Sequence, residues 1–100
     1  MIVIRQTTIF AQWISRLRDE NARARINIRI RRLSLGNPGD VKSVGGGVNE
    51  MRVDYGPGYR IYFTRRGADF VLLLCGGDKR TQAADITTAK TLAKEANDDS

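Results

Sequence analysis

Hydrophobic and polar positions alternate along the chain with two different periods, and these periods divide it into helices and strands. Residues 2–5, IVIR, are typical of a short strand. Thr7 or Thr8 can then cap a helix, because a threonine hydroxyl accepts a hydrogen bond from a free amide of the first turn. The next apolar residues are spaced i, i+3, i+4, i+7, which predicts one helix face made of Phe10, Trp13, Ile14 and Leu17.

A second helical stripe follows the polar segment 19–21, Asp-Glu-Asn, which starts a new helix. Its apolar members are Ala22, Ile26, Ile30 and Leu33. Four arginines fall on the flanks and back of that stripe: Arg23, Arg25, Arg31 and Arg32. Ile28 also lies off the stripe, so we expect this helix to contact a second surface. Two amphipathic helices joined by a short link predict a helical hairpin.

Glycine and proline end this hairpin. Gly36 suits a helix C-cap and Pro38 cannot continue a helix. A loop is predicted from there to about residue 48, and it contains the triple glycine 45–47. A phosphate-binding loop would need the spacing GxxxxGK[ST] between a strand and a helix, which is absent. We therefore interpret the triple glycine as a flexible entry into a strand.

A period of two marks the second half of the chain. Polar and apolar residues alternate over 50–55, a Gly-Pro-Gly turn follows, and alternation resumes over 59–64. Residues 70–75, FVLLLC, are apolar on both faces and predict a central strand covered on both sides. Asp85 can cap a last helix, and residues 97–100 are expected to fray. The order β-α-α-β-β-β-α predicts one α+β domain over residues 1–100, with a mainly antiparallel sheet, the helical hairpin on one face and a C-terminal helix.

Charge changes this picture by indicating a partner. The 100 residues carry a formal net charge of +6, and arginine outnumbers lysine by 13 to 4. Residues 1–66 hold 13 basic and 5 acidic side chains, whereas residues 67–100 hold 4 and 6. Arginine binds phosphate through two nitrogens and stacks on bases, so a polyanionic partner is favoured. The alternative is a basic surface that is only solvated.

Several kinds of chemistry are excluded by composition. There is no histidine, which removes Ser-His and Cys-His catalysis and any imidazole metal ligand. Cys75, the single cysteine, lies within an apolar run and is expected to pack in the core. We expect no metal and no cofactor. The N-terminus lacks a signal-peptide pattern and no apolar run spans a membrane, so a cytoplasmic protein is expected.

Strand pleating brings the candidate chemistry together. If the apolar residues of 50–54 and 59–64 face the helices, then Arg52, Arg60 and Tyr62 share the other, open face. Lys79 and Arg80 follow the next strand and can approach from its end. Converging cations stabilise the charge that builds on a reacting phosphodiester. The alternative is that Arg52 pairs with a neighbouring carboxylate, Glu50 or Asp54, so the spacing alone supports an anion-binding face without establishing catalysis.

Three segments resemble the RelE/ParE toxin superfamily, and most closely its HigB-like, phage-related "addiction module killer protein" branch. They are FAQWISRL, RIRRLSLGNPGDVKSVGGGVNEMRVDYGPGYRIYF and LLLCGGDKRTQAADITTAK, and the resemblance covers about residues 1–95. It implies a RelE-like fold and a cytoplasmic toxin of a type II toxin–antitoxin system. Such toxins enter the ribosomal A site and cut mRNA without a metal, the 2′-OH attacking the adjacent phosphate to leave a cyclic phosphate or its 3′-phosphate product.

The resemblance also implies roles for particular residues. Arg60 of the GYR motif would bind the transition-state phosphate, Arg52 of the E-x-R strand would be a second clamp, and Lys79 of GGDK would contact phosphate or modulate proton transfer. The remaining expectations concern RNA: Gln82 positions RNA or its loop, Tyr62 stacks on a base, and Arg80, Arg25 and Arg32 contact ribosomal RNA. The expected partner is a small helix-turn-helix antitoxin, and operator DNA would be bound only through that complex. The antitoxin can either cover the basic face or block ribosome entry from elsewhere.

One departure from the superfamily leaves alternatives open. Some members place a tyrosine or histidine late in the chain, and here no tyrosine follows Tyr62. Arginine and lysine are poor bases at neutral pH, so ribosomal positioning of the 2′-OH would have to carry more of the catalysis. A ParE-like DNA gyrase poison without nuclease activity, and a plain nucleic-acid-binding module, remain alternatives because one fold serves all three.

Overall fold

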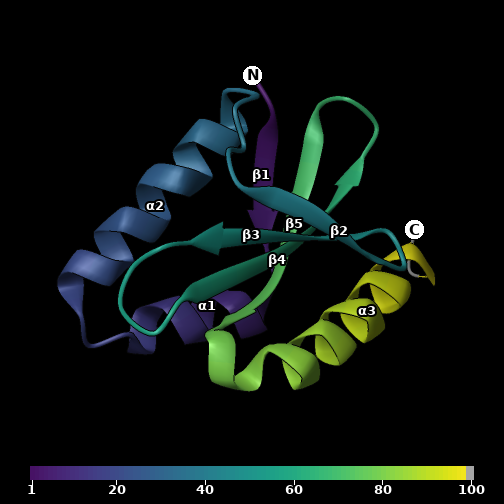
Figure 1. Ribbon diagram of the computed structural model, residues 1–100. Helices are drawn as coiled ribbons and strands as arrows, with labels where there is room; N and C mark the ends of the chain where they lie inside the picture. The colour runs from purple at the N-terminus through teal and green to yellow at the C-terminus, as the bar shows by residue number, and fades with distance from the viewer. Residues whose placement is uncertain (99–100) are drawn as a thin grey trace.

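Five strands form one mixed sheet in the order β1-β5-β4-β3-β2 (Figure 1). The computed structural model describes residues 1–98. β1 pairs with β5 in parallel, and the other three pairings are antiparallel. The expected α+β class is therefore confirmed. The elements are β1 (Val3–Gln6), α1 (Thr8–Arg16), α2 (Glu20–Ser34), β2 (Val41–Gly45), β3 (Val48–Val53), β4 (Tyr59–Arg66), β5 (Phe70–Gly77), the 3-10 turn η1 (Lys79–Thr81) and α3 (Gln82–Asp98).

Short polar side chains start the first two helices, as the sequence predicts. The Thr7 hydroxyl accepts a hydrogen bond from the Phe10 amide at 3.0 Å and donates one to the Leu74 carbonyl at 2.6 Å. The Asp19 carboxylate accepts from the Ala22 amide at 3.1 Å. Thr7 thus caps α1 and also ties it to β5, while Asp19 caps α2.

The larger core lies between the sheet and the helical pair α1 and α2. The two predicted helix stripes pack there against the apolar faces of the strands. The strand residues of this core are Met51, Val53, Tyr59, Ile61, Phe63, Val71 and Leu73. Ile28, expected to contact a second surface, is instead 51% exposed.

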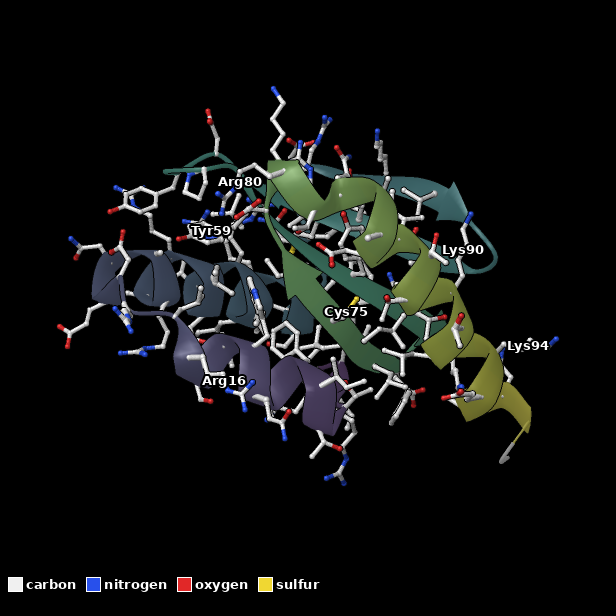
Figure 2. All side chains as sticks on the ribbon, turned by 90° about the horizontal axis from the view of Figure 1, so that it is seen from below. Arg16, Tyr59, Cys75, Arg80, Lys90 and Lys94 are labelled. Carbon is white, nitrogen blue, oxygen red and sulfur yellow. The ribbon has the colours of Figure 1, made fainter. Side chains whose placement is uncertain are left out.

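α3 lies on the opposite face of the sheet, which confirms that residues 70–75 are covered on both sides. The expectation of an open face is wrong at Tyr62, which is buried, whereas Arg52 and Arg60 still line a cavity. A second cluster of buried residues fills this interface: Val48, Tyr62, Leu74, Cys75, Ala89 and Ala93. Ala89 and Ala93 have small side chains, which lets α3 approach the strands closely. Figure 2 shows the helical pair and α3 on different sides of the strands, with side chains filling the space between. Burial raises the pKa of the Cys75 thiol to about 12, which agrees with its expected place in the core.

The predicted loop after α2 contains a strand and a tight turn. β2 pairs with β3 in antiparallel register, with Lys42 opposite Glu50. Gly46 and Gly47 turn the chain between the two strands with φ of 63° and 75°. Positive φ is open to glycine at little cost, so these glycines form a hairpin turn and not a flexible entry.

The last helix begins earlier and ends later than predicted. Asp78 caps η1 by accepting a hydrogen bond from the Arg80 amide, and α3 follows at Gln82. Asp85 therefore lies inside the helix, where its carboxylate accepts from the Thr81 hydroxyl at 2.6 Å. Residues 97 and 98, predicted to fray, are helical, and residues 99–100 lie outside the described part of the chain. Among residues 1–98, no helix combines the length and the apolar character needed to cross a membrane.

Candidate functional site

A cavity of about 360 Å³ lies where the β3–β4 hairpin meets the turn after β5. Arg52, Arg60 and Lys79, the three residues predicted to act on phosphate, all line it. The other lining residues are Asp40, Val53, Asp54, Gly58 and Tyr59. The structure therefore brings the three predicted cations to one site; their catalytic roles stay predictions.

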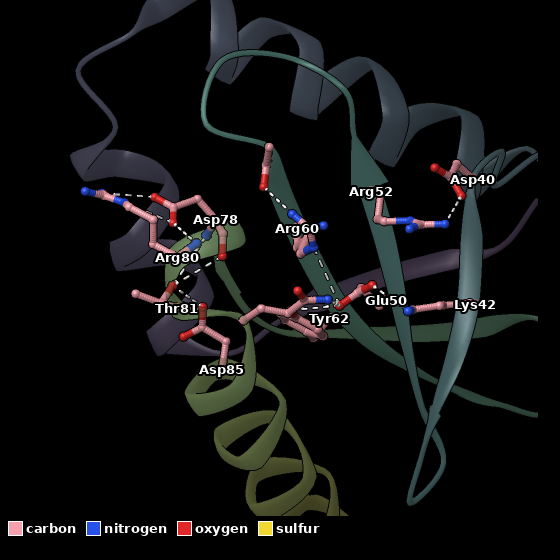
Figure 3. A network of polar contacts seen from close by, with 12 residues as sticks. Asp40, Lys42, Glu50, Arg52, Arg60, Tyr62, Asp78, Arg80, Thr81 and Asp85 are labelled. Carbon is pink, nitrogen blue, oxygen red and sulfur yellow. Dashed lines mark hydrogen bonds and ion pairs between the residues drawn. The ribbon is translucent and has the colours of Figure 1, made fainter.

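Register places two of these cations directly opposite one another. Arg52 on β3 pairs with Arg60 on β4 across the antiparallel ladder. Like charges in that position destabilise a sheet. Each arginine has its own carboxylate partner, as Figure 3 shows: Asp40 for Arg52 and Glu50 for Arg60. The two arginines thus occupy neighbouring positions of the sheet with their charges partly balanced.

Arg52 is attached to the segment before β2. Its Nη2 lies 3.2 Å from the Asp40 carboxylate, and its amide donates to the Asp40 carbonyl at 2.9 Å. The Arg52 carbonyl accepts a hydrogen bond from Arg29 Nη1 at 2.6 Å. The alternative prediction, that Arg52 pairs with Glu50 or Asp54, is wrong, because the carboxylate that pairs with Arg52 is that of Asp40.

Arg60 is held on two sides. Its side chain is 11% exposed, and Nη1 donates to the Gly58 carbonyl at 2.7 Å. On the other side, Nε lies 3.8 Å from Glu50 Oε2. This arginine is therefore nearly buried yet still lines the cavity.

Glu50 is fully buried beside Arg60, a contact that the sequence did not predict. Its Oε2 accepts hydrogen bonds from the Tyr62 hydroxyl at 3.0 Å and from Gln82 Nε2 at 2.9 Å. Burial, and then the hydrogen bond to Glu50, raises the pKa of the Tyr62 phenol well above its ordinary value. The predicted base-stacking role of Tyr62 is wrong, because its ring is fully buried under α3. Gln82 also points to Glu50, so its contribution in this structure is to that network.

Lys79 and Arg80 have different surroundings, and of the two only Lys79 lines the cavity. The Lys79 amide donates to the Pro57 carbonyl at 3.4 Å, which fixes η1 against the Gly-Pro-Gly turn. Arg80 does not line the cavity; its guanidinium is 83% exposed and lies 3.2 Å from the Asp78 carboxylate. The hydrogen bond from the Arg80 side chain lowers the pKa of Asp78.

Three of the five arginines of α2 lie around a second, smaller hollow. Arg25 and Arg32 line a cavity of about 240 Å³ together with Ile28, Arg29 and Val53. The Arg25 guanidinium also stacks 4.5 Å from the centre of the Tyr55 ring. Val53 lines both cavities, so the α2 arginines adjoin the first cavity.

Two carboxylates of the first cavity were not predicted. Asp40 and Asp54 both line it, and both side chains are exposed. Recognising β2 in the sequence would have indicated Asp40, because the residue preceding that strand lies beside Arg52. Residues 1–98 contain no group of three or more His, Cys, Asp or Glu side chains placed to hold a metal ion. Metal independence stays a prediction.

Comparison with known proteins places the chain in a family. A protein from Haemophilus influenzae (strain ATCC 51907 / DSM 11121 / KW20 / Rd), described as an uncharacterized protein, is 51% identical over 94 residues. The alignment covers 94% of this chain and 95% of that protein. The model of the family described as phage derived protein Gp49-like (DUF891) matches residues 12–97, which include every residue of the cavity. The chain belongs to the phage derived protein Gp49-like family.

Proposed function

We propose that this protein is the toxin of a type II toxin–antitoxin system and that it cuts mRNA on the ribosome. The observation that carries the proposal is the convergence of Arg52, Arg60 and Lys79 on one cavity. The Gp49-like family is associated with addiction-module toxins of the RelE and HigB type, which supports the same class of protein.

The cavity suits a phosphodiester in the course of cleavage. When a 2′-OH attacks the adjacent phosphorus, negative charge builds on the non-bridging oxygens. Fixed guanidinium and ammonium groups stabilise that charge without having to reorient. Arg60 is the most firmly held of the three and binds the transition-state phosphate; Arg52 and Lys79 bind from either side.

The proton of the 2′-OH needs an acceptor, and the cavity contains two carboxylates for this role. Asp40 is the better placed, because Arg52 holds it at 3.2 Å and thereby keeps it beside the bound phosphate. The ribosome supplies the in-line alignment of the 2′-OH with the leaving 5′ oxygen. As the 2′-O–P bond forms, the bond from phosphorus to the 5′ oxygen breaks and that oxygen takes a proton from water, so the products are a 2′,3′-cyclic phosphate and a 5′-hydroxyl end.

The proposed partners follow from this activity. They are the ribosomal A site with its mRNA, and a helix-turn-helix antitoxin whose complex with the toxin binds operator DNA. The basic residues around the first cavity fit an RNA backbone.

Cleavage mapping tests the proposal. Purified protein is added to a defined mRNA with and without programmed ribosomes, and 5′ ends are read by primer extension. Wild type should cut at the A site only when ribosomes are present. Arg60→Ala should lower the cleavage rate by at least about 100-fold, the usual loss when a transition-state donor is removed.

Arg65→Ala is the matched control. Arg65 lies on the same strand and is exposed, and within residues 1–98 its side chain makes one hydrogen bond, to the Ala68 carbonyl at 3.2 Å. It should cut like wild type. Absence of cuts in wild type would contradict the nuclease proposal, and a DNA gyrase supercoiling assay would then test the ParE-like alternative. Equal rates for Arg60→Ala and wild type would remove Arg60 from the site.

A further inference from the structure

We propose that Glu50 is a positioning residue that holds the guanidinium of Arg60 in the orientation needed to bind the scissile phosphate. The inference rests on the proposed function, because it concerns the same cavity. Glu50 does not line that cavity and is fully buried, so it acts through Arg60 and not on RNA.

The burial of Glu50 demands an explanation. A carboxylate removed from water is costly unless donors and opposite charges surround it. Oε2 has three such groups: the Tyr62 hydroxyl, the Gln82 amide and Arg60 Nε. Oε1 has no hydrogen-bond partner within residues 1–98 and lies 3.9 Å from Lys42 Nζ. An apolar side chain would fill this position without an unpaired oxygen, so its presence indicates a task other than packing.

The geometry around Arg60 indicates that task. Nη1 is engaged by the Gly58 carbonyl and the Nε edge faces Glu50, whereas Nη2 makes no hydrogen bond within the described residues. One nitrogen is thus hydrogen-bonded within the protein, while Nε is buried without a hydrogen-bond partner and faces only the charge of Glu50 at 3.8 Å; Nη2 is left for a ligand. An arginine fixed in this way before RNA binds loses little rotamer freedom on binding.

Glu50 also links Arg60 to the segment that carries Lys79. Gln82, whose amide binds Glu50, is the first residue of α3 and directly follows η1. The Lys79 amide is in turn bonded to Pro57, in the turn before Arg60. One buried carboxylate therefore lies between the two structural elements that supply cations to the cavity.

The first experiment measures Arg60 directly and needs no enzymatic activity. The Nε–Hε group of Arg60 is assigned in ¹H–¹⁵N NMR spectra, and its hydrogen-exchange rate is compared between wild type and Glu50→Gln. Loss of the carboxylate should speed exchange of this proton at least about tenfold, because the buried opposite charge 3.8 Å from Nε is lost and Arg60 becomes freer to move. An unchanged exchange rate and ¹⁵N shift would overturn the proposal.

Two further variants separate positioning from folding. Tyr62→Phe and Gln82→Leu each remove one donor from Glu50 while keeping the carboxylate, and both should shift the Arg60 Nε resonance. Thr64→Val is the control, since Thr64 lies on the same strand and its buried hydroxyl donates to the Gly47 carbonyl at 2.8 Å. This variant should leave the Arg60 resonance in place although it also removes a buried hydrogen bond. If Glu50→Gln does not fold, the same comparison is decided by Tyr62→Phe and Gln82→Leu.

The second experiment tests whether Glu50 affects the rate of the cleavage step. In the ribosome assay, Glu50→Gln should lower kcat by about 10- to 100-fold with KM changed less than about threefold, because a misplaced Arg60 weakens transition-state binding most. In an Arg60→Lys background, which lacks Nε–H, Glu50→Gln should change kcat by less than about threefold. If the losses of kcat caused by Glu50→Gln and Arg60→Lys multiply fully in the double variant, Glu50 does not act through Arg60. If wild type does not cut at all, the proposed function fails, while the NMR comparison still decides whether Glu50 orients Arg60.

Discussion

At the scale of single residues, the site contains a pair of like charges that lowers the stability of the sheet. Arg52 and Arg60 oppose each other across β3 and β4, a cross-strand pair that a sheet selected only for stability would avoid. Arg60 is compensated by buried Glu50, but Arg52 has only the half-exposed Asp40. The arrangement fits the general observation that active sites carry unfavourable local contacts for the sake of function.

Replacing Arg52 should lower the cleavage activity while leaving the stability of the fold nearly unchanged. Arg52→Thr removes the like-charge pair and introduces a residue that favours strands, while the lost ion pair with Asp40 is exposed and worth little. The free energy of unfolding should change by less than about 1 kcal/mol, measured by urea denaturation. Ribosome-dependent cleavage should fall at least about tenfold. A clear loss of stability with full activity would mean that Arg52 serves the fold.

Asp40 is the proposed proton acceptor, and its amide variant tests that role. Asp40→Asn keeps the size of the side chain and its oxygen toward Arg52, but removes the base. The cleavage rate at neutral pH should fall by about 100-fold or more, the usual contribution of a general base. Ribosome binding, measured by co-sedimentation, should stay close to wild type. A rate within threefold of wild type would transfer the role to Asp54 or to the ribosome.

At the scale of elements, α1, α2, β3 and β4 were predictable because each has a strong period, and β5 because it is a continuous apolar run. The start of α1 at Thr7 or Thr8 and the start of α2 at the polar segment 19–21 were predicted together with their apolar stripes, and the β3–β4 hairpin was predicted with its Gly-Pro-Gly turn. That hairpin alone was sufficient to place Arg52 and Arg60 at one site. Its register is set by local alternation and turn length, both of which are visible in the sequence.

What the sequence did not reveal depends on contacts between distant segments. β2 is a short edge strand in which Val41 and Val44 are the only large apolar residues, so its pattern is weak and its pairing comes from β3. Cover on both sides was predicted for residues 70–75, but that α3 also covers Tyr62 and Glu50 was missed. Its alanines carry little hydrophobic signal, and the burial of Tyr62 and Glu50 follows from that cover. The carboxylate partners Asp40 and Glu50 could therefore not be assigned from spacing.

The packing of α1 on β5 depends on one glycine. A Cβ on Gly76 would lie 2.4 Å from the Trp13 ring. Gly76→Ala should therefore destabilise the protein by about 1–3 kcal/mol, the usual cost of overpacking, measured as a lower urea midpoint. In a Trp13→Leu background the same change should cost clearly less, because the clashing ring is gone. An equal cost in both backgrounds would show that the strain lies elsewhere.

At the scale of the whole molecule, two hollows lined by basic residues adjoin each other. The cavity of Arg52, Arg60 and Lys79 and the hollow lined by Arg25 and Arg32 share Val53. Arg29 joins them, because it lines the second hollow and donates to the Arg52 carbonyl at 2.6 Å. A nucleic-acid backbone that enters the first cavity can therefore continue along α2.

The contact between the two hollows leads to a prediction about both the affinity for the ribosome and its dependence on salt concentration. Reversing Arg25 and Arg32 together to glutamate should weaken ribosome binding and reduce the dependence of log affinity on log salt concentration by about 0.7 to 0.9 per lost phosphate contact. The control variant reverses Arg5 and Arg65, which are exposed, line neither cavity, and change the net charge equally. If only total charge attracts the ribosome, both double variants will weaken binding equally. If α2 contacts RNA directly, only the first will alter the salt dependence strongly, and cleavage of a saturated ribosome complex will change less than binding does.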